Sequence, residues 1–216
     1  MFRPNLLAFY LLLAVSLLSR PISAAEKNVQ IIRGSRELPE MGVFPEFAIV
    51  TEASRISVLQ PRNSQAEADV QARKLKFLLH GYTGTVVLQL STNCPCPGPI
   101  TSEKAPELFQ LVQERFPSAT VRSVGVAHVG RDLGWMFDIE RMTEYNTRLT
   151  TRLAFVSIPD GMLEASLTGS RYSFSTLERT FTTFLGCVQI RDANPSHQTG
   201  EHPREDGNAA LNVAGR

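Results

Sequence analysis

The chain has 216 residues, of which 22 are basic and 21 acidic, and 43% of its residues are hydrophobic. This near-balanced charge argues against nucleic acid or an anionic membrane as a partner, because both attract proteins with a marked basic excess. The length is sufficient for one domain with its own hydrophobic core, even after a leader segment is removed.

The first 25 residues have the three parts of a secretory signal peptide. Arg3 precedes an apolar run over residues 6–18, and small residues at Ala24 and Ala25 suit cleavage. As a helix this run would be about 20 Å long, too short for a hydrocarbon core of roughly 30 Å, which argues against a membrane anchor. We therefore expect a secreted protein with no transmembrane segment after cleavage. Loss of Arg3 and Arg20 would leave it with a net charge of −1.

The chain contains three cysteines, Cys94, Cys96 and Cys187. In an oxidising compartment, one of the first two is predicted to form a disulfide with Cys187, which leaves an odd thiol. A bond between Cys94 and Cys96 would be strained across one proline. Zinc ligation by the three cysteines and a histidine is disfavoured, since there is no second closely spaced ligand pair. The pairing and the fate of the odd thiol stay open.

In chain order, the hydrophobic pattern predicts short strands interspersed with helices. The predicted strands cover residues 29–33, 47–51, 85–90, 119–128, 134–139 and 152–159. The predicted helices cover residues 61–81 and 101–116, with a short helical turn over 139–145. The first helix rests on a broken apolar stripe through Val70, Leu75 and Leu79, with Gly81 as its stop.

Residues 181–190 are predicted to complete the core, and the polar composition beyond Arg191 predicts a flexible tail. The resulting organisation is a signal peptide over 1–25, one globular domain over 26–191 and a tail over 192–216. Because strands and helices are interspersed without βαβ regularity, the predicted fold class is α+β, with short mixed strands and flanking helices.

Four segments carry a pattern in a fixed order. The first segment is the predicted apolar strand that ends at Arg33, the first residue of "RGSR", and it is followed by "GVFP" over 42–45. Three more segments follow: "LQLSTN" over 88–93, "VAHVGRDLGWMFDIERM" over 126–142 and "LAFVSIPDGMLEASLTG" over 153–169. In order and spacing these segments resemble the secreted ADP-ribosyltransferase toxins of the heat-labile enterotoxin A and cholera toxin type. The resemblance covers roughly residues 29–170.

This resemblance implies a toxin-like fold that binds NAD. Arg33 would hold the diphosphate, Ser91 would brace the site from the next strand, and Thr92 would lie beside it. An arginine suits this role because its planar guanidinium pairs with phosphate through two parallel hydrogen bonds.

The sequence departs from the family at its Glu-x-Glu element, which is not recognisable here. The corresponding region, "NTRLTTRLAF" over 146–155, carries no carboxylate, and Glu144 is the plausible surrogate catalytic residue. Loss of the carboxylate costs several kcal/mol of transition-state stabilisation. We therefore expect a secreted effector or toxin-type protein that acts on a protein target or receptor. If it retains activity, it is an NAD-dependent mono-ADP-ribosyltransferase, but a catalytically impaired one.

The alternative is a non-catalytic secreted binding protein of unrelated α+β fold. On that hypothesis Arg33 is a solvated arginine at a strand end, and Ser91 and Thr92 are ordinary turn-forming residues. Glu140 and Glu144 would then form one exposed helical face. A structure in which Arg33, Ser91 and a carboxylate share one cleft would favour the enzyme.

Overall fold

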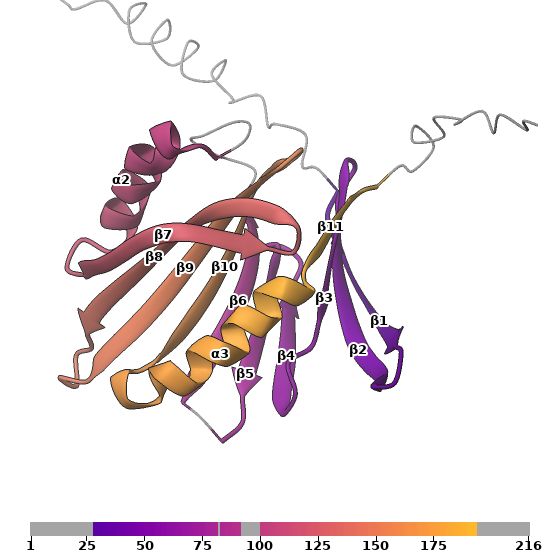
Figure 1. Ribbon diagram of the computed structural model, residues 1–216, viewed down its shortest axis with the longest axis horizontal. Helices are drawn as coiled ribbons and strands as arrows, with labels where there is room; N and C mark the ends of the chain where they lie inside the picture. Colours follow the sequence, from indigo (N-terminus) through magenta and orange to yellow (C-terminus); the bar gives the residue numbers. More distant parts are fainter. Residues whose placement is uncertain (1–27, 82, 92–99, 194–216) are drawn as a thin grey trace, which may run out of the picture.

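The computed structural model describes residues 28–81, 83–91 and 100–193, which form two antiparallel sheets and two α-helices (Figure 1). The predicted signal peptide, nearly all of the predicted tail, Thr92, Cys94 and Cys96 lie outside these ranges. Within them, neither helix has the length and hydrophobicity needed to cross a bilayer.

The smaller sheet has four strands in the order β1-β2-β3-β11. Its strands are β1 (Gln30–Leu38), β2 (Gly42–Val50), β3 (Ser54–Leu59) and β11 (Gln189–Asp192). β1 and β2 form a hairpin in which Leu38 pairs with Gly42. The turn places Glu40 at φ 64° and Gly42 at φ 90°, so the glycine occupies a backbone conformation that other residues rarely adopt.

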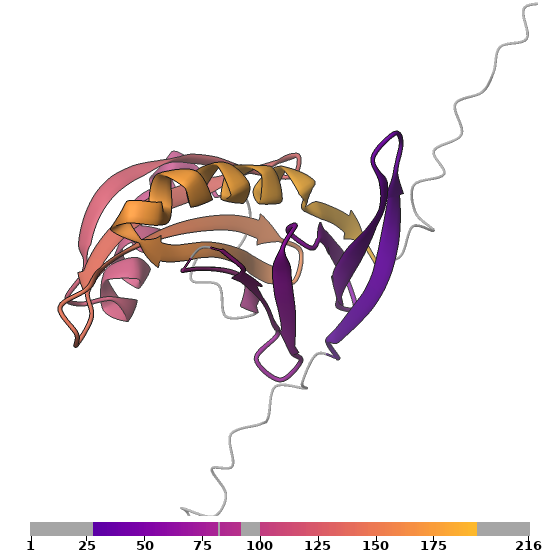
Figure 2. The same cartoon turned by 90° about the horizontal axis from the view of Figure 1, so that it is seen from below.

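The larger sheet has seven strands in the order β4-β5-β6-β10-β9-β8-β7, and every neighbouring pair is antiparallel. Its strands are β4 (Ser64–Asp69), β5 (Lys74–Leu79), β6 (Gly84–Ser91), β7 (Thr120–Val129), β8 (Asp132–Met142), β9 (Arg148–Ile158) and β10 (Gly161–Ser170). The sheet curves around one helix (Figure 2).

The two helices cover opposite faces of the larger sheet. A 3₁₀ turn, η1 (Ser102–Lys104), leads into α2 (Ala105–Arg115), whereas α3 (Arg171–Cys187) follows β10 directly. Along β9, Leu153 and Phe155 pack in the cluster with α2, whereas Ala154 and Val156 pack in the cluster with α3. Since alternate strand residues point to opposite faces, the helices lie on opposite sides.

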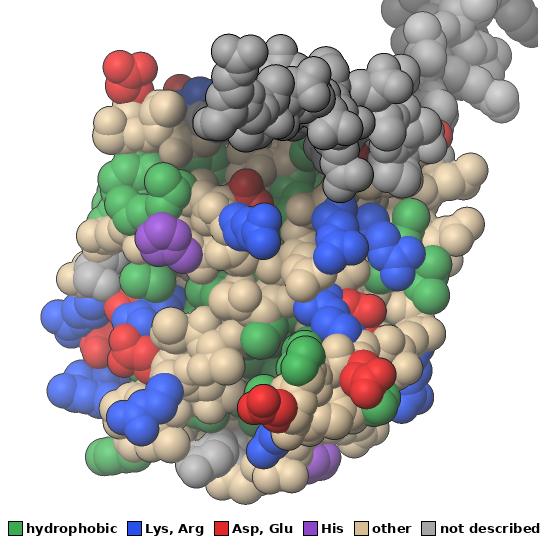
Figure 3. Space-filling view, turned by 45° about the vertical axis from the view of Figure 1, so that its right-hand side comes forward, with side chains coloured by type: hydrophobic (Ala, Val, Ile, Leu, Met, Phe, Trp, Pro, Cys, Tyr) green, Lys and Arg blue, Asp and Glu red, His purple; other side chains and the backbone are tan. Residues whose placement is uncertain are grey.

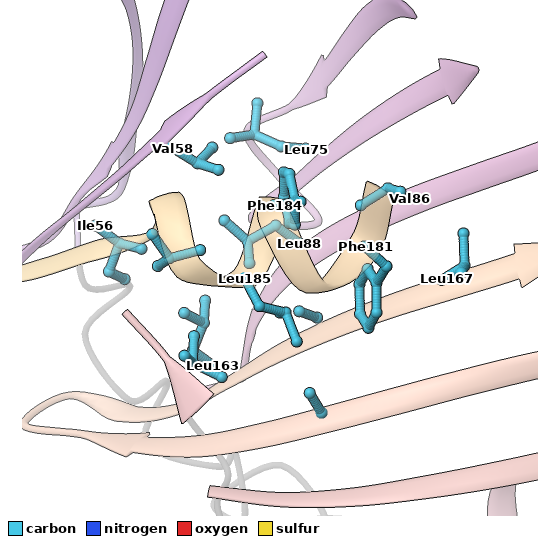
Figure 4. Close-up of a cluster of buried hydrophobic side chains, with 14 of the residues drawn as sticks. Ile56, Val58, Leu75, Val86, Leu88, Leu163, Leu167, Phe181, Phe184 and Leu185 are labelled. Carbon is cyan, nitrogen blue, oxygen red and sulfur yellow. The ribbon is translucent and has the colours of Figure 1, made fainter. Parts of the chain in front are cut away.

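The main core lies between α3 and both sheets. From α3, Phe181, Phe184 and Leu185 point into a cluster formed by residues of both sheets (Figure 4). Phe77 of β5 is fully buried there and meets the rings of Phe47 and Phe184 edge-on, with centroids 5.8 and 5.6 Å away. α3 therefore packs against the smaller sheet as well as the larger one.

The predicted α+β class with short mixed strands and a toxin-like architecture is wrong. The described residues are mostly antiparallel strand, arranged in two sheets, and β8 and β9 each have 11 residues. The error has a physical cause: β9 is covered by α2 on one face and α3 on the other. Only its segment 153–156, "LAFV", is continuously apolar, whereas the preceding residues 148–152 are mostly polar, so the pattern indicates the second half of the strand and hides its full length.

The predicted helix over 61–81 is also wrong, because this segment forms the β4–β5 hairpin. Leu75, Phe77 and Leu79 are buried at every second position, which is the period of a strand. The predicted helical turn over 139–145 is instead the end of β8 and a tight turn. The helix predicted over 101–116 is confirmed by η1 and α2, with Leu108 and Val112 on its buried face.

Candidate functional site

Arg33 lies in the middle of β1, with its guanidinium carbon 5.9 Å from the centre of the Phe47 ring. It faces an open pocket of about 420 Å³, whose polar lining includes Gln60, Ser64, Gln65 and His80. No carboxylate is among the described residues that line this pocket. Arg33 thus lies among hydrogen-bond donors, as an anion site requires.

Ser91 does not line the Arg33 pocket. It is the last residue of β6, where it pairs with Met162 of β10. The pocket lies along the edge strand β4, and β5 separates β4 from β6. With neighbouring strands about 4.8 Å apart, Ser91 is roughly 10 Å or more away from the pocket wall.

Glu144 lies in the turn between β8 and β9, where it is exposed. Thr143 N donates to Thr147 O at 2.9 Å across this turn. The turn is at the end of the sheet where Gly84 begins β6, seven residues before Ser91. Ser91 is level with Ser157 of β9, nine residues from Arg148 at the turn, so at about 3.3 Å per residue Ser91 and Glu144 are about 30 Å apart along the strands.

The structure therefore does not bring Arg33, Ser91 and Glu144 into one cleft, and NAD binding by these residues stays a prediction. Glu140 and Glu144 do not form a helical face, because Glu140 belongs to β8. There Glu140 accepts hydrogen bonds from Arg122 at 3.0 and 3.1 Å.

A second pocket, of about 360 Å³, lies between the β1–β2 hairpin, the β3–β4 connection and α3; we call it the hairpin–helix pocket. Its walls are mainly apolar and include Leu38, Met41, Phe44, Leu59, Pro61 and Phe184. Gln60, Arg62, Arg179, Thr180, Thr183 and Cys187 complete the lining. Its volume is within the range of about 300–1,000 Å³ that is typical of small-molecule sites.

Two local features build this pocket. The tight turn at Glu40 and Gly42 projects Met41, whose side chain is 59% exposed, at the tip of the hairpin. On α3, Thr180, Phe184 and Cys187 recur at helical spacing and therefore lie on one face. The hairpin and the helix thus offer two facing walls, which the β3–β4 connection joins.

Arg152 holds α3 against the larger sheet. Its guanidinium donates to both oxygens of Asp138, at 2.6 and 2.7 Å, and to Glu178 of α3 at 2.5 Å. It also lies 5.7 Å from the ring centre of Phe174. The hydrogen bonds to Asp138 raise the pKa of Arg152 above its ordinary value, against the opposing effect of burial. The helix wall of the pocket is thereby fixed in position.

Cys187 is half-buried in the pocket lining and carries a free thiol. Its predicted partners, Cys94 and Cys96, lie outside the described residues. Across the part of the chain that the structure describes, no three His, Cys, Asp or Glu side chains are grouped to hold a metal ion.

Sequence reasoning missed the hairpin–helix pocket because it missed most of α3. The signal was present: Phe174, Leu177, Phe181 and Phe184 are spaced three or four residues apart, the period of a helix. Frequent Thr and Phe residues, which favour strands, obscured this period. The prediction that residues 181–190 complete the core agrees with the burial of Phe181, Leu185 and Val188.

Comparison with models of protein families found no match, and no curated protein matches the sequence. Among solved structures, the chain is similar to LpqN of Mycobacterium tuberculosis, a protein involved in cell envelope biogenesis. The two share 11% identity, the match covers 76% of this chain and 91% of LpqN, and the TM-score is 0.42.

Proposed function

We propose that this protein is a non-catalytic binding protein that holds an apolar small molecule or chain in the hairpin–helix pocket. The apolar lining of that pocket carries the proposal. Burial of apolar ligand surface is favourable by roughly 25 cal/mol per Å², so such a pocket binds through the hydrophobic effect. The predicted signal peptide favours a secreted protein as the carrier of this activity.

The positions of the predicted catalytic residues favour binding over ADP-ribosyl transfer. Transfer needs an anion-binding arginine and a carboxylate within reach of the same ligand. Glu144 is exposed in a turn at one end of the larger sheet, and Ser91 is at the other end. Arg33 has a polar pocket of its own, which offers an anion site without a neighbouring carboxylate.

The proposal is tested by titration of the purified protein with N-phenyl-1-naphthylamine, an uncharged dye that fluoresces in apolar surroundings. We expect saturable binding of one dye per chain. Thr183→Trp fills the pocket from α3 and should weaken dye binding at least tenfold. Thr182→Trp is the matched control, because Thr182 is exposed on the same helix but does not line the pocket.

Thermal unfolding followed by circular dichroism establishes that both variants fold. A wild-type protein without saturable dye binding would overturn the proposal. So would equal weakening by Thr182→Trp and Thr183→Trp, since the dye would then bind outside the pocket.

A further inference from the structure

Two arginines line the otherwise apolar hairpin–helix pocket. Arg62 lies on the β3–β4 connection, with its guanidinium carbon 5.3 Å from the centre of the Phe44 ring. Arg179 lies on α3, four residues before Thr183, on the face that lines the pocket. Both side chains are exposed, so their charges are at the mouth of the pocket rather than in its interior.

Neither arginine has an acidic partner within the described part of the chain. The salt bridges there involve Arg36, Lys76, Arg115, Arg122 and Arg152. The described lining of the pocket also contains no Asp or Glu. On the side of the molecule that carries β1, β2 and β11, basic side chains are spread across the surface, with acidic side chains and apolar patches between them (Figure 3).

The ring contact places the Arg62 guanidinium beside the apolar wall of the pocket. A guanidinium that stacks on an aromatic face keeps its N–H groups free at its edge, where they pair with a carboxylate or a phosphate. Phe44 also belongs to the apolar wall, so the site of positive charge and the apolar interior meet at one residue.

We infer that the ligand of the hairpin–helix pocket is an amphipathic anion: an alkyl chain with a carboxylate or phosphate head group. The chain fills the apolar interior, and the head group accepts hydrogen bonds from Arg62 and Arg179. This inference rests on the proposed function, because it assigns a head group to a ligand that the pocket must first bind. Charge complementarity carries it: two arginines without acidic partners among the described residues lie at the mouth of an apolar pocket, where the head group of a bound amphiphile would be.

The test compares three competitors of N-phenyl-1-naphthylamine that have the same alkyl chain: dodecanoate, dodecyl phosphate and dodecan-1-ol. The two anions are used below their micelle concentrations, and the alcohol is used below its solubility limit. In the wild-type protein, both anions should displace the dye at concentrations about tenfold or more below that of the alcohol, because charge-assisted hydrogen bonds are the stronger ones. The tighter anion identifies the head group. Inorganic phosphate alone should not displace the dye.

The variant R62Q/R179Q removes both charges and keeps polar side chains. Displacement by the two anions should weaken about tenfold more than displacement by dodecan-1-ol does, when each is compared with the wild type by the same dye assay. R148Q is the matched control, since Arg148 is an exposed arginine on β9 away from the pocket. Its affinities should equal those of the wild type.

Equal affinities of the wild type for dodecanoate and dodecan-1-ol would overturn the head-group assignment while the proposed function stands. The head-group assignment would also be overturned if R62Q/R179Q weakened binding of dodecan-1-ol as much as binding of the two anions. Absence of dye binding would overturn the proposed function and this inference with it. Sedimentation velocity tests whether a second copy of the chain occupies the pocket instead. If the dye binds only when a dimer dissociates, the pocket is a dimer interface and the inference is overturned.

Discussion

A substitution at Gly134 tests the packing of the larger sheet. Gly134 lies in β8, next to Trp135, which pairs with Phe155 of β9. A Cβ atom added at Gly134 would lie 1.9 Å from the carbonyl oxygen of Phe155 and 2.9 Å from its carbonyl carbon. Both atoms are backbone atoms, so no rotation of a side chain relieves the overlap. Only glycine permits this close approach of the two strands.

The magnitude follows from the size of the overlap. Non-bonded heavy atoms are normally about 3.5 Å or more apart, so β9 would have to move by roughly 1.6 Å. Such a shift disturbs the pairing of β8 with β9 at the end of their ladder, where Trp135 is opposite Phe155. Overpacking of this kind costs about 1–3 kcal/mol, and we expect Gly134→Ala near the upper end because backbone must move.

The assay is urea unfolding followed by circular dichroism, with Gly125→Ala as the matched control. Gly125 lies in the neighbouring strand β7, and a Cβ atom there meets nothing within 4 Å. With a slope of about 2 kcal/mol per molar urea, a loss of 3 kcal/mol lowers the midpoint by about 1.5 M. Gly125→Ala should change stability by less than about 0.5 kcal/mol. Midpoints that agree within this margin for both variants would refute the account of β8 and β9.

Two further stability predictions concern the core and α3. Phe77 is fully buried and contacts two aromatic rings, so Phe77→Ala should lower the free energy of unfolding by about 3–5 kcal/mol. Tyr172 is 97% exposed, so the control Tyr172→Ala should change the free energy of unfolding by less than about 0.5 kcal/mol. Arg152→Met removes the cation that joins Asp138 to α3 and should cost about 2 kcal/mol by urea unfolding. Arg148→Met, at an exposed arginine of the same strand, should be nearly neutral, and equal losses in both would contradict the role of Arg152.

The sequence predicted the elements whose pattern is local and unambiguous. Leu108, Val112 and Phe116 recur at helical spacing after proline-rich sequence, and α2 forms there. "TVVLQL" is rich in residues that favour strands, and it lies within β6. In both segments, local preference and tertiary environment agree, so the pattern of a short window was enough.

The prediction from sequence was wrong where the apolar residues fit both the period of a helix and the period of a strand. In residues 61–81, Val70, Leu75 and Leu79 fit a helical stripe, but Leu75, Phe77 and Leu79 also alternate. The alternation prevailed because Phe77 packs between Phe47 and Phe184, which only the assembled sheets and α3 bring together. The predicted site failed to assemble for a related reason, since strand order decides which strand ends meet. Ser91 and Glu144 lie at opposite ends of one sheet.

The sequence by itself determined α2 and at least part of six of the eleven described strands, including the arginine-bearing first strand, because each depends on residues close together in the chain. Only the tertiary structure decided the two-sheet architecture and the hairpin–helix pocket. The pocket walls come from residues 38–44, 59–62 and 179–187, and nothing in any one of these segments indicates the others. They meet because α3 buries its aromatic face against both sheets, an effect of packing between distant parts of the chain.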